Sequence, residues 1–160
     1  MAVDMFIKID SVDGESKDKA HKKEIDVRAW SWGASNSGSA HAGGGAGSGK
    51  VNVQDLSFTK WVDSATPKLL LAVHDGKHFA SATLVVRKAG EKPVEYLKIK
   101  LEEVLITSLS TGGSGGEDRL TENVTLNFGK VSVDYVPQDD KGAAGTAIPF
   151  AWDIAANAKA

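Results

Sequence analysis

The sequence contains no cysteine, which excludes disulfide bonds, thiolate nucleophiles and cysteine metal sites. It contains no run of about 18 apolar residues, so no membrane-spanning helix is expected. Residues 1–10 include acidic side chains and no long apolar stretch, so we expect no conventional signal peptide. The formal net charge is only −2, which gives no sign of a nucleic-acid-binding patch and permits self-association.

What the sequence does contain is a repeated pattern of alternating apolar and polar residues. In residues 104–109 and 123–128, β-branched, aliphatic and aromatic side chains recur at every second position, which is typical of β-strands. Four glycines lie between residues 112 and 116, where they allow the chain to reverse. The 160 residues are enough to bury a core, and we expect one mainly β domain over residues 1–160.

Several predicted strands change their alternation midway, which indicates bent strands. Ile25 and Val27 share one face of a strand, whereas Trp30 and Trp32 fall on the other, so a bulge is expected near Arg28. The small residues Ala29, Ser31 and Gly33 then form the opposite face. The same slip in the alternation of apolar and polar residues occurs within residues 51–59, at residues 102–103 and at Gly129. Further strands are expected around residues 5–9, 82–86 and 150–154. Such shifts predict a barrel or a corner-turning sandwich.

One helix is predicted over about residues 64–75. Thr66 is expected to be its N-cap, Pro67 its first helical residue, and Gly76 its C-terminal stop. An apolar stripe of Leu69, Leu70 and Val73 is expected to pack on the sheet.

Residues 36–50 are expected to form a long extended loop. The segment holds six glycines among alanines and serines, and it carries no charged residue before Lys50. Such a composition buries too little apolar surface to order itself. Two interpretations stay open, a hairpin tip without a partner and an arm that a partner orders.

Several short segments match catalytic or metal-binding motifs, but each lacks the neighbouring residues or secondary structure that the motif requires. Residues 112–116 match the G-x-S-x-G nucleophile motif, but all four histidines precede Ser114. Residues 44–50 resemble a phosphate loop, but Val51 replaces the required Ser or Thr and a strand follows. His74 and His78 have helical spacing, but Gly76 interrupts the helix between them, so no zinc site is expected. Residue chemistry therefore favours a binding or assembly domain over an enzyme, with no catalytic residues and no cofactor.

Several whole segments of the sequence are distinctive, and the most specific is Ser110–Phe128 (STGGSGGEDRLTENVTLNF). Others are Met5–Asp10 (MFIKID), Glu24–Val27 (EIDV), Ala29–Gly33 (AWSWG), Val51–Lys60 (VNVQDLSFTK) and Arg87–Gly90 (RKAG). In these segments the sequence resembles the Hcp family, the tube proteins of bacterial type VI secretion systems. The resemblance implies a two-sheet antiparallel β-barrel with one short flanking helix and a long extended loop, like a phage tail tube.

The resemblance also implies assembly partners and a route by which the protein leaves the cell. Homohexameric rings are expected to stack into a tube inside a contractile sheath, with a VgrG-type spike at the tip and small effectors in the lumen. The protein is expected in the cytoplasm before firing and outside the cell afterwards, without membrane insertion or nucleic-acid binding. A monomeric carbohydrate-binding sandwich that uses Trp30, Trp32 or Trp61 is the alternative.

The predicted site residues are surfaces for assembly. Interface residues are expected in the arm (Ser37, Gly38, His41, Gly43, Gly44, Gly45, Gly47 and Lys50), in one turn (Gly90 and Glu91) and beside the glycine-rich reversal (Glu117, Asp118 and Arg119). Ala29, Ser31 and Gly33 are expected to face the lumen. The 89–93 turn and the C-terminal tail are expected at the ring rims.

Overall fold

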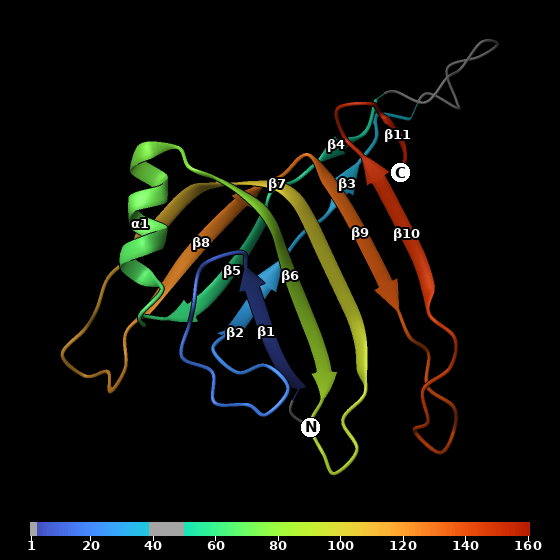
Figure 1. The fold of residues 1–160 in the computed structure, drawn as a ribbon, viewed down its shortest axis with the longest axis horizontal. Coiled ribbons are helices and arrows are strands. Elements are labelled where there is room, and N and C mark those ends of the chain that lie inside the picture. Colours follow the sequence, from blue (N-terminus) through green and yellow to red (C-terminus); the bar gives the residue numbers. More distant parts are fainter. Residues whose placement is uncertain (1–2, 39–49) are drawn as a thin grey trace.

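The computed structural model describes residues 3–38 and 50–160, and this part of the chain is mainly β (Figure 1). Its elements, in chain order, are β1 (Val3–Ile9), β2 (Ile25–Ser31), β3 (Ala34–Ser35), β4 (Asn52–Val53), β5 (Leu56–Trp61), α1 (Thr66–Asp75), β6 (His78–Lys88), β7 (Glu95–Thr111), β8 (Thr121–Asn127), β9 (Lys130–Tyr135), β10 (Ile148–Asp153) and β11 (Ala158–Lys159).

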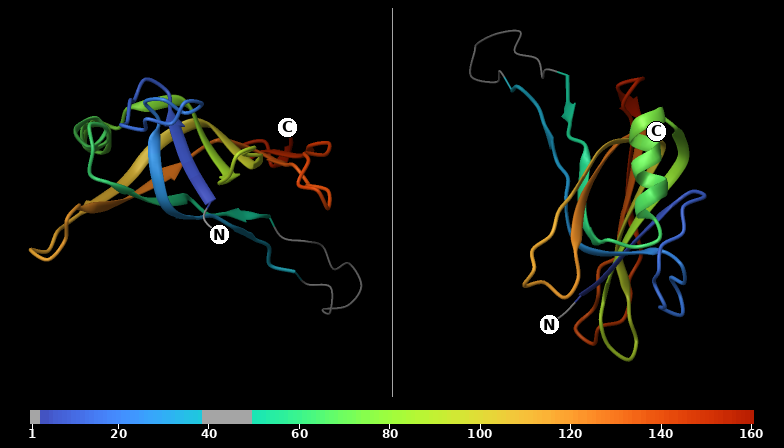
Figure 2. Two further views of the ribbon diagram at one scale, coloured as in Figure 1. Left: turned by 90° about the horizontal axis from the view of Figure 1, so that it is seen from below. Right: turned by 90° about the vertical axis from the view of Figure 1, so that its left-hand side faces the viewer.

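Six antiparallel strands close into a barrel. The strands run in the order β7-β6-β1-β2-β5-β8, and the pairing of β8 with β7 closes the circle. Strands β9, β10 and β11 extend the sheet outward from β7, and β3 pairs with β4 in a separate two-stranded ribbon that leads away from the barrel (Figure 2). The predicted fold class, a mainly β barrel with one short helix, is confirmed, and two half-barrels correspond roughly to the predicted two sheets.

Two strands turn the corners between these halves. In β2, Val27 pairs with Lys60 and Ala29 with Thr59, which leaves Arg28 as the bulge that the sequence predicted. Strand β7 pairs with β9 up to Glu102 and with β8 from Leu105 onward. Between them Glu103 has a φ of 57°, so the predicted slip at residues 102–103 is confirmed.

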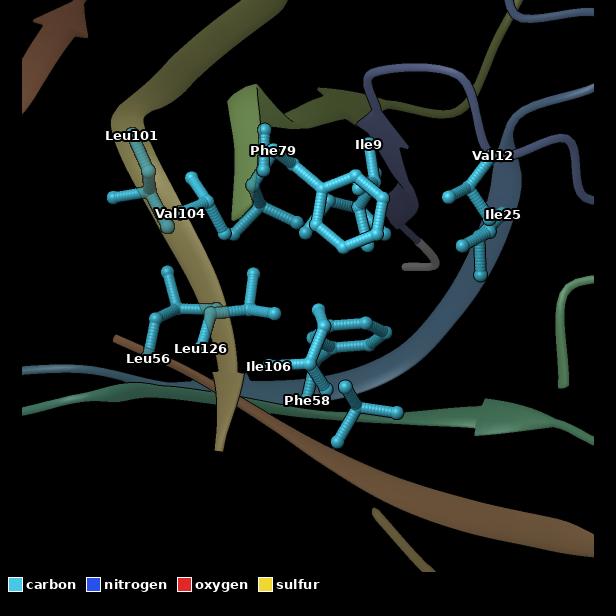
Figure 3. Close-up of a cluster of buried hydrophobic side chains, with 14 of the residues drawn as sticks. Ile9, Val12, Ile25, Leu56, Phe58, Phe79, Leu101, Val104, Ile106 and Leu126 are labelled. Carbon is cyan, nitrogen blue, oxygen red and sulfur yellow. The ribbon is translucent and has the colours of Figure 1, made fainter. Parts of the chain in front are cut away.

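The core fills the space between the two halves. Figure 3 shows Leu56, Phe58, Ile106 and Leu126 on one side facing Ile9, Phe79 and Val104 on the other. All of these side chains are at most 5% exposed. The half-buried Trp30 and Trp32 pack against the same core, which confirms that the bulge brings them to the inner side.

The helix differs from the prediction at its N-terminus. Its N-cap is Ala65 and has no side-chain capping bond; Thr66 is the first helical residue. Gly76 ends the helix as predicted, with a φ of 68° and its N–H bonded to the carbonyl of Ala72. The predicted stripe is partly wrong, because Leu70 is 41% exposed while Ala72 is buried.

Two strand predictions also need correction. The strand expected over residues 51–59 is two strands, β4 and β5, which belong to different ladders. The strand expected from Phe150 begins at Ile148, and the short β11 follows it.

Candidate functional site

The outer surface of β2, β5, β8 and the second half of β7 carries two rows of small, uncharged side chains. One row is Ser31, Ser57, Thr125 and Ser108, and the other is Ala29, Thr59, Asn123 and Ser110. Alternate residues of a strand point to opposite sides, so the intervening Trp30, Phe58 and Val124 point into the barrel. We call these eight residues the neutral face.

Hydrogen bonds between strands stabilise the middle of the neutral face. The hydroxyl oxygens of Ser57 and Thr125 are 3.2 Å apart, and Thr59 donates to the side-chain oxygen of Asn123 at 2.6 Å. Within residues 3–38 and 50–160, the hydroxyls of Ser31, Ser108 and Ser110 have no protein partner. The exposed hydroxyls at the margins of the neutral face are therefore available to another molecule.

The charges closest to the neutral face along its strands are engaged within the protein. At one end, Asp55 accepts from the amide of Asn127 at 2.9 Å and from the hydroxyl of Thr107 at 3.4 Å. At the other end lies Trp61, the register partner of Thr121. The guanidinium carbons of Arg28 and Arg119 lie 4.5 and 4.4 Å from the centre of its ring.

Arg119 was predicted to lie at an interface, beside Glu117 and Asp118. In the described part of the chain no ion pair forms between Arg119 and Glu117 or Asp118; the guanidinium lies over Trp61 instead. Burial raises the pKa of the nearby Asp26 carboxyl, and the positive charge of Arg119 acts in the opposite direction.

The outer surface of β1, β6 and the first half of β7 is different, because the β1–β2 loop (residues 10–24) lies over it. Arg87 of β6 donates to Asp18 of the loop and to Asp4 of β1. These hydrogen bonds hold the pKa of Asp18 below its usual value. The His21 ring stacks on Phe6, with ring centres 4.5 Å apart.

Both nitrogens of His21 also contact carboxylates. Nδ1 lies 2.9 Å from Glu24, and Nε2 lies 2.6 Å from Glu95 at the start of β7. We call Asp4, Asp18, His21, Glu24, Arg87 and Glu95 the ionic clamp.

A second charged group lies inside the barrel beneath the neutral face. The ammonium of Lys60 is 2.8 Å from Asp63 and 3.5 Å from Glu122, its neighbour across the β5–β8 pair. Thr66 donates to Glu122 at 2.7 Å and accepts from Lys60 at 3.2 Å. Lys60 and Glu122 are 0% and 1% exposed, so this network joins the barrel to the start of α1 in the interior.

An apolar groove of about 270 Å³ lies where the arm leaves the barrel. Its lining comes from the base of the arm and from β9 and β10, and consists of Trp32, Ala34, Val51, Val53, Val131, Phe150 and Trp152. The tryptophans proposed as a sugar platform do not offer flat exposed rings. Trp30 and Trp32 are half-buried against the core, and Trp61 is covered by two guanidinium groups.

The predicted interface residues lie at separate places on the surface. Ser37, Gly38 and Lys50 are exposed at the base of the arm, whereas His41, Gly43, Gly44, Gly45 and Gly47 fall outside the described residues. Gly90 and Glu91 are exposed in the β6–β7 turn, and Glu117, Asp118 and Arg119 are exposed in the β7–β8 reversal (Figure 1).

The three residues predicted to face a lumen lie on or next to the neutral face. Ala29 and Ser31 are exposed on it, and Gly33 is half-buried just beyond the end of β2. Ser57, Thr59, Ser108, Ser110, Asn123 and Thr125 also belong to this surface and were not predicted, because their alignment depends on the strand register.

Within residues 3–38 and 50–160, no three His, Asp or Glu side chains are placed to hold a metal ion. His74 and His78 are both exposed. The one helix in the described ranges has ten residues, and it is neither long nor apolar enough to span a bilayer.

Residues 6–135 match the family model described as "Type VI secretion system effector, Hcp". Protein hcp1 of Pseudomonas aeruginosa is 68% identical over 162 residues, with all of both chains covered. The chain belongs to the Hcp family of type VI secretion proteins.

Solved structures agree with this assignment. One, described as a type six secretion system protein, is 36% identical, covers 99% of this chain and 100% of its own, and superposes with a TM-score of 0.94. Hcp1 of Salmonella typhimurium is 35% identical over all of both chains, with a TM-score of 0.82.

Proposed function

We propose that this protein is the structural subunit of a type VI secretion inner tube. Six copies close into a ring, the neutral face lines the central channel, and rings stack into a hollow tube that carries small effectors. The observation that carries this proposal is the neutral face, an uncharged surface on four strands of a chain in which 25% of residues are charged.

The distribution of the exposed segments supports ring formation. In a cyclic assembly, neighbouring copies meet through two different patches, so interface residues need not lie together on one subunit. We assign contact with a neighbouring copy to the arm, and contact between stacked rings to the β6–β7 turn and the C-terminal tail. The β7–β8 reversal, with Glu117, Asp118 and Arg119, is a further interface surface.

The role proposed is structural and not catalytic. A contractile sheath surrounds the tube and a VgrG-type spike closes its tip, and the whole tube leaves the cytoplasm on firing. This proposal draws on membership of the Hcp family and on the open, uncharged channel surface.

Native mass spectrometry combined with negative-stain microscopy tests the proposal. We expect particles of six copies with a central hole. A protein that stays monomeric at high concentration, with no ring-shaped particles, contradicts it.

Shortening the segment 37–50 tests the role of the arm. We expect weaker ring or tube formation with an unchanged circular dichroism spectrum, because Ser37, Gly38 and Lys50, the described ends of this segment, are exposed. Unchanged assembly of the shortened protein refutes this assignment.

A further inference from the structure

The neutral face also indicates how cargo is selected. We infer that it is a charge-blind wall, which accepts polypeptide cargo of either charge sign and contacts it through hydroxyl and amide groups. This inference rests on the proposed tube function, because it requires the neutral face to line the space where cargo travels.

The neutral face carries no charged side chain over a continuous area. Four adjacent strands span roughly 14 Å at the usual strand spacing. Across that width, both rows consist of serine, threonine, asparagine and alanine. The pocket around Ser31, Ser57 and Thr59 is lined by no ionised group, so neither sign of charge is attracted or repelled there. At the margin toward the β7–β8 reversal, Glu117 lines a pocket together with Ser110 and Asn123.

In addition, the charges at the two ends are held by the protein itself. Asp55 is hydrogen-bonded to Thr107 and Asn127, and Arg28 and Arg119 lie over the ring of Trp61. They are not free to reach across the neutral face. At physiological salt, charges farther than about 8 Å are largely screened in water.

Some hydrogen-bonding groups of the neutral face remain available. Ser57, Thr59, Asn123 and Thr125 pair with one another across β5 and β8. On the neutral face, the hydroxyls without a partner among the described residues belong to Ser31 on β2 and to Ser108 and Ser110 on β7. Because such exposed, neutral groups also bond to water, each contact is weak, and cargo held this way is released readily.

Single cysteines measure the electrostatic environment directly, because the chain has no cysteine of its own. We would compare Ser31→Cys and Ser108→Cys for their rates of reaction with cationic and anionic methanethiosulfonate reagents. Each rate is divided by the rate of the same reagent with 2-mercaptoethanol, a thiol that carries no other charged group. We expect the two normalised rates to agree within about twofold, and to change little between low and high salt.

Gly116→Cys is the matched control. Residue 116 adjoins Glu117 and Asp118, and a Cβ there meets no atom within 4 Å. We expect this thiol to favour the cationic reagent at low salt and to lose the preference at high salt. A preference of about tenfold or more for either sign at Ser31→Cys or Ser108→Cys overturns the inference.

A second experiment tests the consequence for cargo. Two fluorescein-labelled peptides of equal length, one lysine-rich and one glutamate-rich, are mixed with assembled rings of the wild type, Ser108→Lys and Ser108→Gln. We expect the wild type and Ser108→Gln to hold both peptides equally. Ser108→Lys should hold the acidic peptide about tenfold better, and high salt should remove the difference. Discrimination by the wild type, or none by Ser108→Lys, contradicts the inference.

These experiments separate the inference from the proposed function. If no ring forms, the proposed function fails, whereas the reactivities of the cysteines still report the charge of the neutral face. If rings form and either thiol prefers one sign of reagent strongly, the tube proposal stands and the charge-blind wall is wrong.

Discussion

The outer surfaces of the two halves of the barrel differ in their charge and in whether another segment of the chain covers them. On β1, β6 and the first half of β7, the β1–β2 loop is held down by the ionic clamp around Arg87 and His21. On β2, β5, β8 and the second half of β7, no segment covers the sheet within the described residues, and the surface is uncharged. The chain thus covers one outer surface itself and leaves the other open.

The same contrast appears in where the charged residues of the open half point. Lys60 and Glu122 belong to β5 and β8, but both lie in the interior and interact with Asp63 and Thr66. Lys60 of β5 and Glu122 of β8 are therefore buried beneath the sheet, whereas the charged residues of the ionic clamp lie on the outer surface of the covered half. This difference supports the proposal that the open half lines the channel.

The largest effect is expected from Lys60→Met. This change leaves the carboxylates of Asp63 and Glu122 in the interior without their cation, and breaking a buried ion pair in this way costs about 3–5 kcal/mol. Urea unfolding gives the loss of stability. Adding Glu122→Gln to Lys60→Met should recover part of it, and a double variant that is less stable than the single one contradicts this account.

Arg87→Gln should have the next largest effect, because it removes the cation of the ionic clamp from Asp4 and Asp18. We expect a loss of about 1–3 kcal/mol. Hydrogen exchange in residues 13–24 should become faster, while exchange in β5 and β8 changes little. Lys88→Gln, at the exposed neighbouring position, is the control, and equal loop protection in both variants argues against the clamp.

The covered half should also respond to pH through Asp18. Arg87 lowers the pKa of the folded-state carboxyl below its ordinary value of 3.8. The stabilisation is therefore present above that value and is lost as the pH falls through the lower, folded-state pKa. Thermal unfolding should show Asp18→Asn less stable than the wild type near neutral pH, with the difference shrinking toward pH 3. A difference that grows on acidification contradicts this assignment.

The smallest effect is expected from Ser57→Ala combined with Thr125→Ala. These residues form one hydrogen-bonded pair on the neutral face, and such cross-strand pairs contribute about 0.2–1 kcal/mol. Urea unfolding should show a loss within this range, and sedimentation should show unchanged assembly. A loss of several kcal/mol would mean that the face stabilises the barrel more than its exposure indicates.

The sequence predicts much of the local structure here and less of the site. The bulge at Arg28 and the small face of Ala29 and Ser31 follow from the alternation of side chains along one strand, which is a local property. The rest of the neutral face depends on register between distant segments, since Ser57 and Thr125 are 68 residues apart. Single-strand patterns contain no information on that alignment.

The error at the start of α1 has a similar origin. Thr66 has the side chain of a good N-cap, but its hydroxyl donates to Glu122, 56 residues away in the sequence. A buried carboxylate competes here with the local capping bond, and a strand far along the chain supplies that carboxylate. Tertiary contacts of this kind override the local preference.

A cryo-electron-microscopy map of the assembled particle tests the central claim most directly, because it reveals which outer surface of the barrel faces inward. We predict a six-fold ring in which β2, β5, β8 and the second half of β7 line the hole, with the β1–β2 loop on the outside. A ring whose hole is lined by the ionic clamp, or a neutral face buried between subunits, would contradict it.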